Sequence, residues 1–349
     1  AEKQDETEDV VDKNARQASP PPHMMPAARG LHVPNFSSFQ PRDVRFTTVG
    51  SIPQVAWSCD GRKLASVGMD KSVRVWTPDK SLEARSAVQY LGGHEADTDY
   101  VVWNPTHPEL FCSSSQRDKR IVFWDARQSR PLQIYTHTVA PAQLNFGPDG
   151  KTLSIISVSY QLAFLTYGQA EGKKPEWSLK KLDTVPQTAS IAMFNHVGDG
   201  IILSHTRMNT IMIMDYPSLT IREQPPAHVG GCVAVALDPR GRYLASGGHD
   251  SIVNLFDMSE WICANTITSC EHPINQLSFS FDGEFIAIAS LGSYIEICAT
   301  ETGQSVHRIP ISGPAVTVTW HPSKYVIAYC GQNSGAVHSV FMSLYGPGL

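Results

Sequence analysis

The stretch VAWSCDGRKLASVGMDKSVRVW, residues 55–76, decides the fold. Its first apolar run ends at Trp57, Asp-Gly at 60–61 marks a turn, and KLASVG follows as a second apolar run. Asp-Lys at 70–71 marks another turn, after which residues 72–76 alternate polar and apolar side chains. Short strands separated by turns that contain Asp and Gly are typical of an antiparallel meander. The stretch therefore predicts three consecutive antiparallel strands.

The same pattern recurs along the rest of the chain. The first predicted strand of each copy ends at an anchor residue, and the anchors are Trp57, Trp103, Phe146, Phe194, Leu237, Phe279 and Trp320. Successive anchors lie 41 to 48 residues apart. A period of about 40–45 residues with four strands per unit is typical of a β-propeller. The sequence therefore predicts an all-β fold, a seven-bladed β-propeller over residues 43–345.

The two ends of the repeat region predict how the ring closes. After the third strand of the last copy, expected at residues 336–341, almost no chain remains for a fourth strand. The segment VRFTTVG at residues 44–50 is a predicted strand without a blade of its own. Since pairing the two would remove two open edges, we expect residues 44–50 to complete the last blade. Residues 1–42 are charged and Pro-rich without periodicity, so we predict a disordered tail.

Polar residues recur at fixed spacing around the second turn of three copies. Ser stands four residues before the turn Asp, and an aromatic residue stands six after it. The spacing resembles that of WD-repeat propellers, in which these residue types form a buried hydrogen-bond network. A network built to satisfy a buried Trp N–H is a structural device, so we do not interpret it as a hydrolase triad. The predicted members are His94, Ser114, Asp118 and Trp124; Ser66, Asp70 and Trp76; and His228, Ser246 and Asp250.

Composition and motif content argue against several function classes. The chain has 349 residues, 17 % of them charged, and a net charge of −5. Residues 1–12 contain six acids and one base, so the remainder is neutral overall. The sequence contains no nucleotide-binding loop or metal-ligating motif, no Cys-x-x-Cys pair and no apolar run long enough to cross a bilayer. We expect a non-catalytic protein with no metal, no cofactor and no membrane contact.

Basic and aromatic side chains near the turns are candidate contacts for partners. The candidates are Lys71, Arg117, Lys119, Arg120 and Trp261. Lysines at 173–174 and 180–181 are suited to RNA phosphate, as are the basic residues at 117–120. Because no aromatic–basic interleaving accompanies them, we expect RNA contact to be weak or indirect.

A four-residue motif offers an alternative function. Trp124-Asp125-Ala126-Arg127 matches the Trp-Asp-x-Arg pattern of propellers that act as substrate receptors of cullin-type ubiquitin ligases. Arg127 is then the candidate contact for the ligase. The motif is short, and many WD repeats contain it by chance.

The order of the repeat variants resembles one WD-repeat family, the third subunits of the THO complex. The segments that carry the resemblance are residues 55–66, 101–127, 216–257, 272–290 and 317–329. The sequence departs from the family pattern at Phe146 and Gly292, where the family tends to carry Trp and a turn Asp. The resemblance implies a non-catalytic scaffold, located in the nucleus and docked on a large helical THO subunit. The family's complex couples transcription and mRNA processing to mRNA export.

Overall fold

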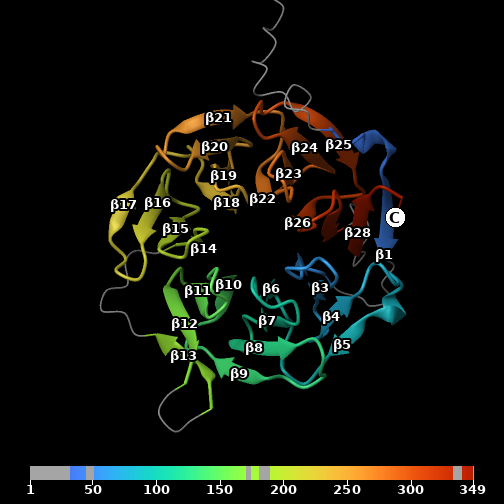
Figure 1. Cartoon of the computed structure of the whole chain (residues 1–349), viewed down its shortest axis with the longest axis vertical. Coiled ribbons are helices and arrows are strands. Elements are labelled where there is room, and N and C mark those ends of the chain that lie inside the picture. Colours follow the sequence, from blue (N-terminus) through green and yellow to red (C-terminus); the bar gives the residue numbers. More distant parts are fainter. Residues whose placement is uncertain (1–31, 45–50, 170–173, 181–188, 333–339, 349) are drawn as a thin grey trace, which may run out of the picture. The chain divides into compact units, whose positions relative to one another are not determined.

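The computed structural model describes residues 32–44, 51–169, 174–180, 189–332 and 340–348. The chain divides into two units, residues 1–33 and 34–349, and all of the first except His32 and Val33 lies outside the described residues. In the second unit the described strands form seven four-stranded antiparallel sheets, arranged as the blades of a ring (Figure 1). The predicted all-β, seven-bladed propeller is confirmed.

Each blade is a meander that runs from an innermost strand to an outermost one. In that order, the first three blades are β2 (Gln54–Trp57), β3 (Leu64–Val67), β4 (Val73–Trp76) and β5 (Val88–Tyr90); β6 (Tyr100–Trp103), β7 (Leu110–Ser114), β8 (Arg120–Asp125) and β9 (Gln133–Thr136); and β10 (Pro141–Phe146), β11 (Thr152–Ser157), β12 (Leu162–Gly168) and β13 (Glu176–Lys180). The next two are β14 (Ile191–Phe194), β15 (Gly200–Ser204), β16 (Ile211–Asp215) and β17 (Ile221–Glu223); and β18 (Cys232–Leu237), β19 (Tyr243–Gly248), β20 (Val253–Asp257) and β21 (Cys263–Ile267).

The last two blades complete the ring. They are β22 (Ile274–Phe279), β23 (Phe285–Ser290), β24 (Tyr294–Ala299) and β25 (Ser305–Pro310); and β26 (Ala315–Trp320), β27 (Ile327–Gln332), β28 (Val340–Gly346) and β1 (Gln40–Val44). Two short 3-10 helices are also described, η3 (Phe36–Ser38) and η4 (Ala84–Ser86).

The predicted anchor residues occupy equivalent places in all seven blades. Each one ends the innermost strand of its blade, from Trp57 at the end of β2 to Trp320 at the end of β26. Each also packs in or against a different one of the seven apolar clusters found among the described residues. Every cluster combines strands of two neighbouring blades. The core is therefore divided into seven inter-blade layers, and the period seen in the sequence is the period of these layers.

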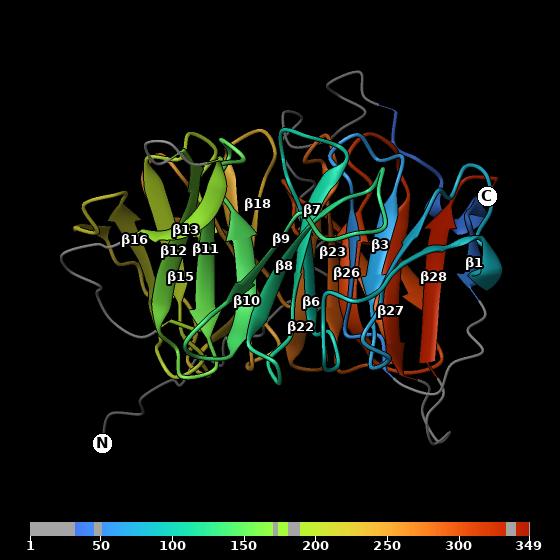
Figure 2. The same ribbon diagram turned by 90° about the horizontal axis from the view of Figure 1, so that it is seen from below.

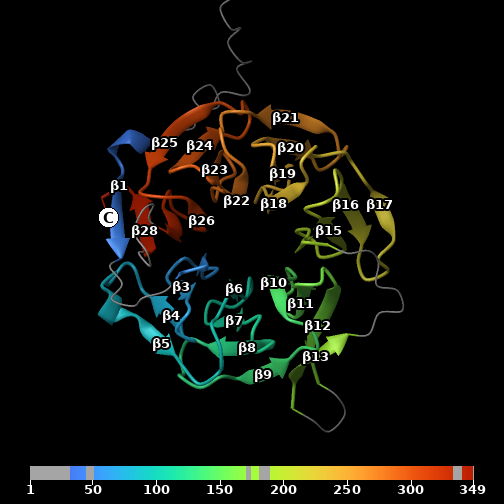
Figure 3. The same cartoon turned by 180° about the vertical axis from the view of Figure 1, so that it is seen from behind.

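The seventh blade is closed by a strand from the beginning of the propeller. β1 pairs antiparallel with β28, from Gln40 opposite Gly346 to Val44 opposite Met342, and the two lie side by side in Figures 1 and 3. Of the segment 44–50 that we expected to close the blade, only Val44 belongs to β1, and residues 45–50 lie outside the described residues. Of the neighbouring strand predicted at residues 336–341, Val340 and Phe341 belong to β28, and residues 336–339 lie outside the described residues.

The structure differs from the predicted tail at residues 34–42. Phe36 and Phe39 are buried, and the Phe36 ring centroid lies 5.0 Å from that of Phe285 in the sixth blade. The hydroxyl of Tyr345 donates a hydrogen bond to the Phe36 carbonyl. The burial of two aromatic rings against distant blades orders this segment. These buried rings contradict the tail boundary that we predicted at residue 42. The prediction missed them because a contact between residues far apart in the chain leaves no trace in local periodicity.

Two kinds of turn define the two faces of the ring, which Figure 2 shows edge-on. Turns between the first and second strands of a blade form the Gly-turn face, named after Gly61, Gly150 and Gly283. Turns between the second and third strands form the Asp-turn face, named after Asp70, Asp118 and Asp250. Because the strands are antiparallel, the loop that enters each new blade also lies on the Asp-turn face.

Candidate interaction surfaces

A buried polar network joins the strands of the second blade. Asp118 Oδ2 lies 3.2 Å from His94 Nδ1, and Ser113 Oγ lies 2.7 Å from His94 Nε2. Trp124 Nε1 donates to the same Ser113 hydroxyl at 2.8 Å. Burial lowers the pKa of His94 although the Asp118 carboxylate beside it acts in the opposite direction. The lowered pKa favours the neutral ring. With Nδ1 protonated, each member of the chain from Trp124 to Asp118 donates to the next one.

The hydroxyl in this network belongs to Ser113, whereas the sequence spacing predicted Ser114. Phe111 is paired with Trp124 across β7 and β8, and the bridging serine stands two residues after that partner. The turn that follows is one residue longer here than in the fifth blade, so counting back from Asp118 selects the wrong serine. Ser114 Oγ is buried with no hydrogen-bond partner among the described residues.

The two neighbouring serines give a matched pair of variants. Ser113→Ala removes the shared partner of Trp124 Nε1 and His94 Nε2, so we expect the free energy of unfolding to fall by about 2–3 kcal/mol. Ser114→Ala removes a buried hydroxyl without a described partner, so we expect no loss of stability. Urea unfolding monitored by tryptophan fluorescence measures both. Equal losses would contradict the assignment of Ser113.

The other two predicted networks are variants of this one. In the fifth blade His228 Nε2 lies 2.8 Å from Ser246 Oγ, and its Nδ1 lies 3.1 Å from Asp250 Oδ1. Phe256 occupies the place of the tryptophan and has no N–H to satisfy. The first blade also carries the turn aspartate but lacks the histidine.

In that first blade the carboxylate of Asp70 accepts hydrogen bonds from Ser72 Oγ at 2.7 Å and from the guanidinium of Arg74. Ser66 and Trp76 are buried, and their membership of the network stays a prediction. An arginine on the third strand therefore contacts the turn aspartate, which an imidazole contacts in the other two blades. All three arrangements bind the turn aspartate into its own blade, which is a structural task.

A different set of contacts links neighbouring blades on the Gly-turn face. Asn104 Nδ2 donates to the Gly150 carbonyl at 2.8 Å, and His321 Nε2 lies 3.0 Å from the Gly61 carbonyl. Arg240 Nη2 donates to the Gly283 carbonyl at 2.7 Å in the same way. The sequence analysis did not find these links. The sequence signal for such a link is a polar residue shortly after the anchor of one copy, combined with the Asp-Gly turn of the next copy.

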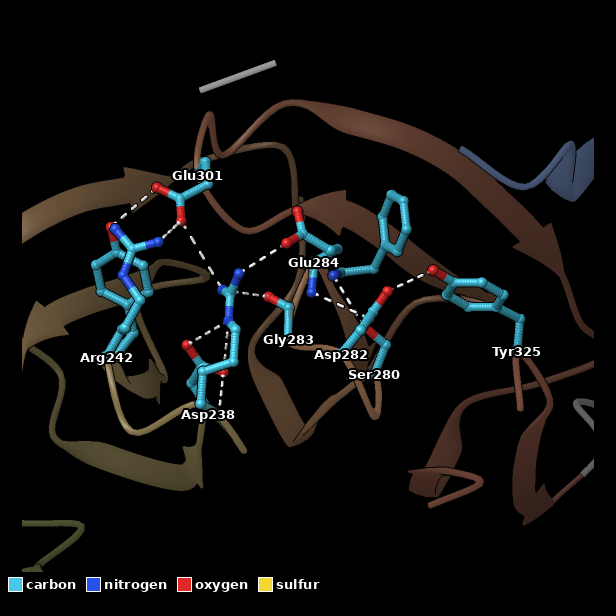
Figure 4. Close-up of polar contacts among 11 residues, drawn as sticks. Asp238, Arg242, Ser280, Asp282, Gly283, Glu284, Glu301 and Tyr325 are labelled. Carbon is cyan, nitrogen blue, oxygen red and sulfur yellow. Dashed lines mark hydrogen bonds and ion pairs between the residues drawn. The ribbon is translucent and has the colours of Figure 1, made fainter. Parts of the chain in front are cut away.

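A larger charged cluster between the fifth and sixth blades includes the acids Asp238, Glu284 and Glu301 (Figure 4), and Arg240 contacts all three of them. Arg240 Nη1 donates to Glu284 Oε1 at 2.8 Å, and its Nε contacts the fully buried carboxylate of Asp238 at 3.1 Å. Glu301 accepts hydrogen bonds from Arg242 and, at 3.0 Å, from the hydroxyl of Tyr243. Burial opposes the charge of Arg240, but the hydrogen bond to Asp238 and the nearby carboxylates raise its pKa.

A second group of polar contacts, also drawn in Figure 4, connects the sixth and seventh blades. The hydroxyl of Tyr325 donates to Asp282, whose other oxygen accepts from Ser280 Oγ at 2.6 Å. Burial and hydrogen bonding to that carboxylate both raise the pKa of Tyr325. Acids and donors are thus paired across both blade junctions. This geometry holds blades together, and we assign it no chemical reaction.

The structure separates the predicted partner contacts between the two faces. Lys71, Arg117 and Lys119 lie in turns of the Asp-turn face and are exposed. Arg117 pairs with Asp97 at 3.2 Å while its side chain remains 75 % exposed. Arg120 is less available, because its guanidinium donates to Glu95 Oε1 at 2.6 Å and to a backbone carbonyl.

Arg127 and Trp261 follow the third strands of their blades and so lie on the Gly-turn side. The Arg127 side chain is 64 % exposed, and its guanidinium pairs with Asp125 at 2.6 Å, a contact that raises the pKa of Arg127. Trp261 is partly buried and packs against the apolar cluster between the fourth and fifth blades. Trp261 therefore acts as a packing residue, which disfavours its use as an exposed anchor.

The lysine-rich connection of the third blade is only partly described. Lys174 is exposed, and Lys180 donates to the hydroxyl of Tyr216 at 3.0 Å while lying over its ring. Lys173 and Lys181 lie outside the described residues. The described part of the chain contains no group of three or more potential metal ligands. None of its helices has the length and apolarity needed to cross a membrane.

The Asp-turn face also carries exposed apolar side chains in many of its loops. Val229 is 89 % exposed and Leu291 is 51 % exposed. The other members are Met69, Leu91, Val158 and Met208. Loops of the Gly-turn face also carry exposed apolar residues, such as Val197 and Phe281, but those of the Asp-turn face are more numerous. Exposed apolar side chains of this kind offer contacts to other proteins.

Comparison with known proteins agrees with this architecture. The family model for the WD domain, G-beta repeat, matches residues 45–77 and 220–257, and that for the anaphase-promoting complex subunit 4 WD40 domain matches residues 261–323. The solved β-propeller domain of Cps50 (Swd1) from Myceliophteria thermophila superposes with a TM-score of 0.73 at 16 % identity. The match covers 87 % of this chain and 99 % of that domain, and it shows the fold alone.

Two relatives match over most of the propeller. The WD repeat-containing protein AAC3 of Dictyostelium discoideum is 28 % identical over 296 residues, which cover 79 % of this chain and 60 % of that protein. THO complex subunit 3 of Arabidopsis thaliana is 33 % identical over 282 residues, 81 % of this chain and 87 % of the relative. The predicted resemblance is confirmed: the chain belongs to the WD-repeat family of THO complex subunit 3.

Proposed function

We propose that the protein is a non-catalytic scaffold subunit of a nuclear THO-type complex that couples transcription and mRNA processing to mRNA export. The identity of 33 % to THO complex subunit 3 across 87 % of that relative's length carries the proposal. A match that extends over most of the ring supports a shared use of the whole propeller. The partners we propose are a large helical THO subunit and other proteins of the export complex.

The structure of the ring suits a scaffold. Seven inter-blade clusters and the hydrogen bonds between blades hold its loops in place. A preordered surface loses little conformational entropy on binding, so more of its contact energy is available for affinity. The exposed apolar side chains of the Asp-turn face, including Val229 and Leu291, are the surface on which we place the helical partner. We propose that RNA contact is weak or indirect, since Arg117 and Arg120 already pair with acids.

Affinity purification of the tagged chain from nuclear extract tests the proposal. We expect recovery of a large helical THO subunit, reduced about tenfold by the double change Val229→Asp and Leu291→Asp. Val197→Asp is the matched control, because Val197 is 78 % exposed but lies on the Gly-turn face. Absence of THO subunits from the purified material would refute the proposal. Recovery of a cullin adaptor that is lost on Arg127→Ala would favour the ubiquitin-ligase alternative.

A further inference from the structure

An exposed serine lies between two arginines in the loop that connects β8 to β9 of the second blade. This loop comprises residues 126–132 and leads to the outermost strand of the blade (Figure 1). Arg127, Ser129 and Arg130 are all exposed. The Ser129 hydroxyl forms no hydrogen bond with any described residue. The loop therefore presents a free hydroxyl group that is flanked in the chain by two arginine side chains.

Backbone hydrogen bonds hold the two ends of this loop but not its middle. The N–H of Gln128 donates to the Asp125 carbonyl at 3.0 Å, and the N–H of Leu132 donates to the Phe123 carbonyl at 2.8 Å. Within the described chain, the N–H groups of residues 129 and 130 make no such bond. An exposed segment with few backbone hydrogen bonds can change its conformation at low cost, as an enzyme that modifies a side chain requires. The middle of this loop meets that requirement.

Another exposed serine beside an exposed arginine, in the first blade, provides a comparison. Ser86 directly follows Arg85, and both belong to the short helix η4. The Ser86 hydroxyl donates to the Glu83 carbonyl at 2.7 Å, and its backbone N–H donates to the same carbonyl at 2.9 Å. Arg85 pairs with the Glu83 carboxylate at 2.5 Å. Ser86 therefore lacks the two properties that distinguish Ser129, which are an unbonded hydroxyl and an unbonded backbone N–H.

The two arginines of the loop in the second blade offer their guanidinium groups in different ways. Arg127 is held by Asp125, since its Nε and Nη2 lie 2.9 and 2.6 Å from the two carboxylate oxygens. The Arg127 side chain nevertheless remains mostly exposed. Arg130 forms no ion pair with a described residue, so its guanidinium can turn toward an incoming group. The loop therefore has two positive charges, and a nearby carboxylate compensates only one of them.

We propose that Ser129 is a phosphorylation site of a protein kinase that selects arginine beside its target serine. The Ser129 Oγ attacks the γ-phosphorus of ATP, its proton passes to the catalytic aspartate of the kinase, and ADP leaves. Kinases with this preference have carboxylates beside the substrate cleft, which bind guanidinium groups through paired, charge-assisted hydrogen bonds. Arg127, two residues before the serine, and Arg130, directly after it, supply the groups for such contacts.

Phosphorylation of Ser129 reverses the charge of the loop. A phosphoserine adds about −1.5 to −2 charge at pH 7, which exceeds the single uncompensated positive charge. The phosphate oxygens accept hydrogen bonds from Arg130 and compete with Asp125 for Arg127. A partner that contacts the Arg127 guanidinium therefore binds the unmodified chain more tightly. The loop lies on the Gly-turn side, away from the surface proposed for the helical THO partner, so the inference goes beyond the proposed function.

The test is phosphorylation of the purified full chain in vitro, and tandem mass spectrometry locates the phosphate. The probes are the catalytic domains of cAMP-dependent protein kinase and protein kinase C, which select basic residues, and casein kinase 2, which selects acidic ones. Each reaction contains ATP and Mg²⁺. Chymotrypsin cleaves after Trp124 and Leu132, so it keeps Ser129 and both arginines in one peptide. We expect at least one of the two basic-selective kinases to phosphorylate Ser129 about tenfold faster, or more, than casein kinase 2 does.

Matched variants test the role of the arginines. Arg127→Gln combined with Arg130→Gln should lower the initial rate at Ser129 about tenfold or more, because the kinase loses both guanidinium contacts. Arg62→Gln is the control, since the Arg62 side chain is 79 % exposed on the Gly-turn face but lies outside the loop. It should change the rate by less than about twofold. Ser86 in the same chain should gain phosphate about tenfold more slowly than Ser129, or less.

Several results would each overturn the proposal. They are the absence of phosphate from Ser129 while an arginine-containing control peptide in the same reaction is phosphorylated, equal phosphorylation of Ser86 and Ser129, and an unchanged rate in the double arginine variant. Circular dichroism checks that the variants are folded. The tagged chain recovered from nuclear extract with phosphatase inhibitors should contain the same phosphopeptide, and its absence there would also contradict the proposal. The in vitro assay contains no THO subunit, so its failure and that of the proposed function are distinguishable.

Discussion

Gly61→Ala is expected to lower the free energy of unfolding by about 2–4 kcal/mol, because it acts at the junction of the first and last blades. Gly61 has φ +73°, a region that costs an L-residue about 1–2 kcal/mol. A Cβ built at Gly61 would lie 2.2 Å from Cε1 of His321, the residue that bonds to the Gly61 carbonyl. Such overpacking adds typically 1–3 kcal/mol. Urea unfolding of the variant and the parent chain measures the difference.

Gly92→Ala is the matched control for this effect. Gly92 has φ +80°, but an added Cβ would meet no heavy atom within 4 Å, so only the backbone cost of about 1–2 kcal/mol remains. A double-mutant cycle with His321→Ala then isolates the clash, since the imidazole is absent from the double variant. If Gly61→Ala and Gly92→Ala lower the free energy of unfolding equally, the clash with His321 makes no contribution of its own to the loss.

Removal of residues 1–44 is expected to lower the melting temperature by about 10 °C or more and to promote aggregation. The deletion takes away β1, the fourth strand of the seventh blade, and leaves the backbone of β28 as an open edge. It also takes away Phe36 and Phe39, and loss of one buried phenylalanine side chain typically costs about 3–5 kcal/mol. Thermal circular dichroism measures the melting temperature, and size-exclusion chromatography measures the aggregation.

A chain that begins at Pro34, and so lacks only residues 1–33, serves as the control for this deletion. It lacks the acidic segment but keeps η3 and β1, so its melting temperature should match that of the full chain. Should the chain lacking residues 1–44 melt at the same temperature as this control, β1 would not be required to close the ring. Phe36→Ala in the full chain distinguishes the contribution of the buried ring from that of the strand.

Sequence reasoning predicted the elements whose signals lie within short stretches of the chain. The anchors from Trp57 to Trp320 end the innermost strands because each is the last apolar residue before a turn, a local signal repeated seven times. The His228, Ser246 and Asp250 contacts follow the same local spacing. Counting back from the turn aspartate selected the wrong serine in the second blade, because its turn is one residue longer. Ser113 could be chosen over Ser114 only through its pairing across the sheet, which places it two residues beyond the partner of Trp124.

The sequence by itself determined the propeller and its number of blades, because strand period and turn chemistry are local and are repeated in every copy. The order of the repeat variants carried the resemblance to the family. Tertiary structure alone decided which residues meet between blades. Phe36 packs against Phe285, and His321 bonds to Gly61 across 260 positions of the chain. Asp99 and Val316, which come from different blades, line one cavity. Such contacts arise from closure of the ring, which brings together side chains whose separation along the chain carries no periodic signal.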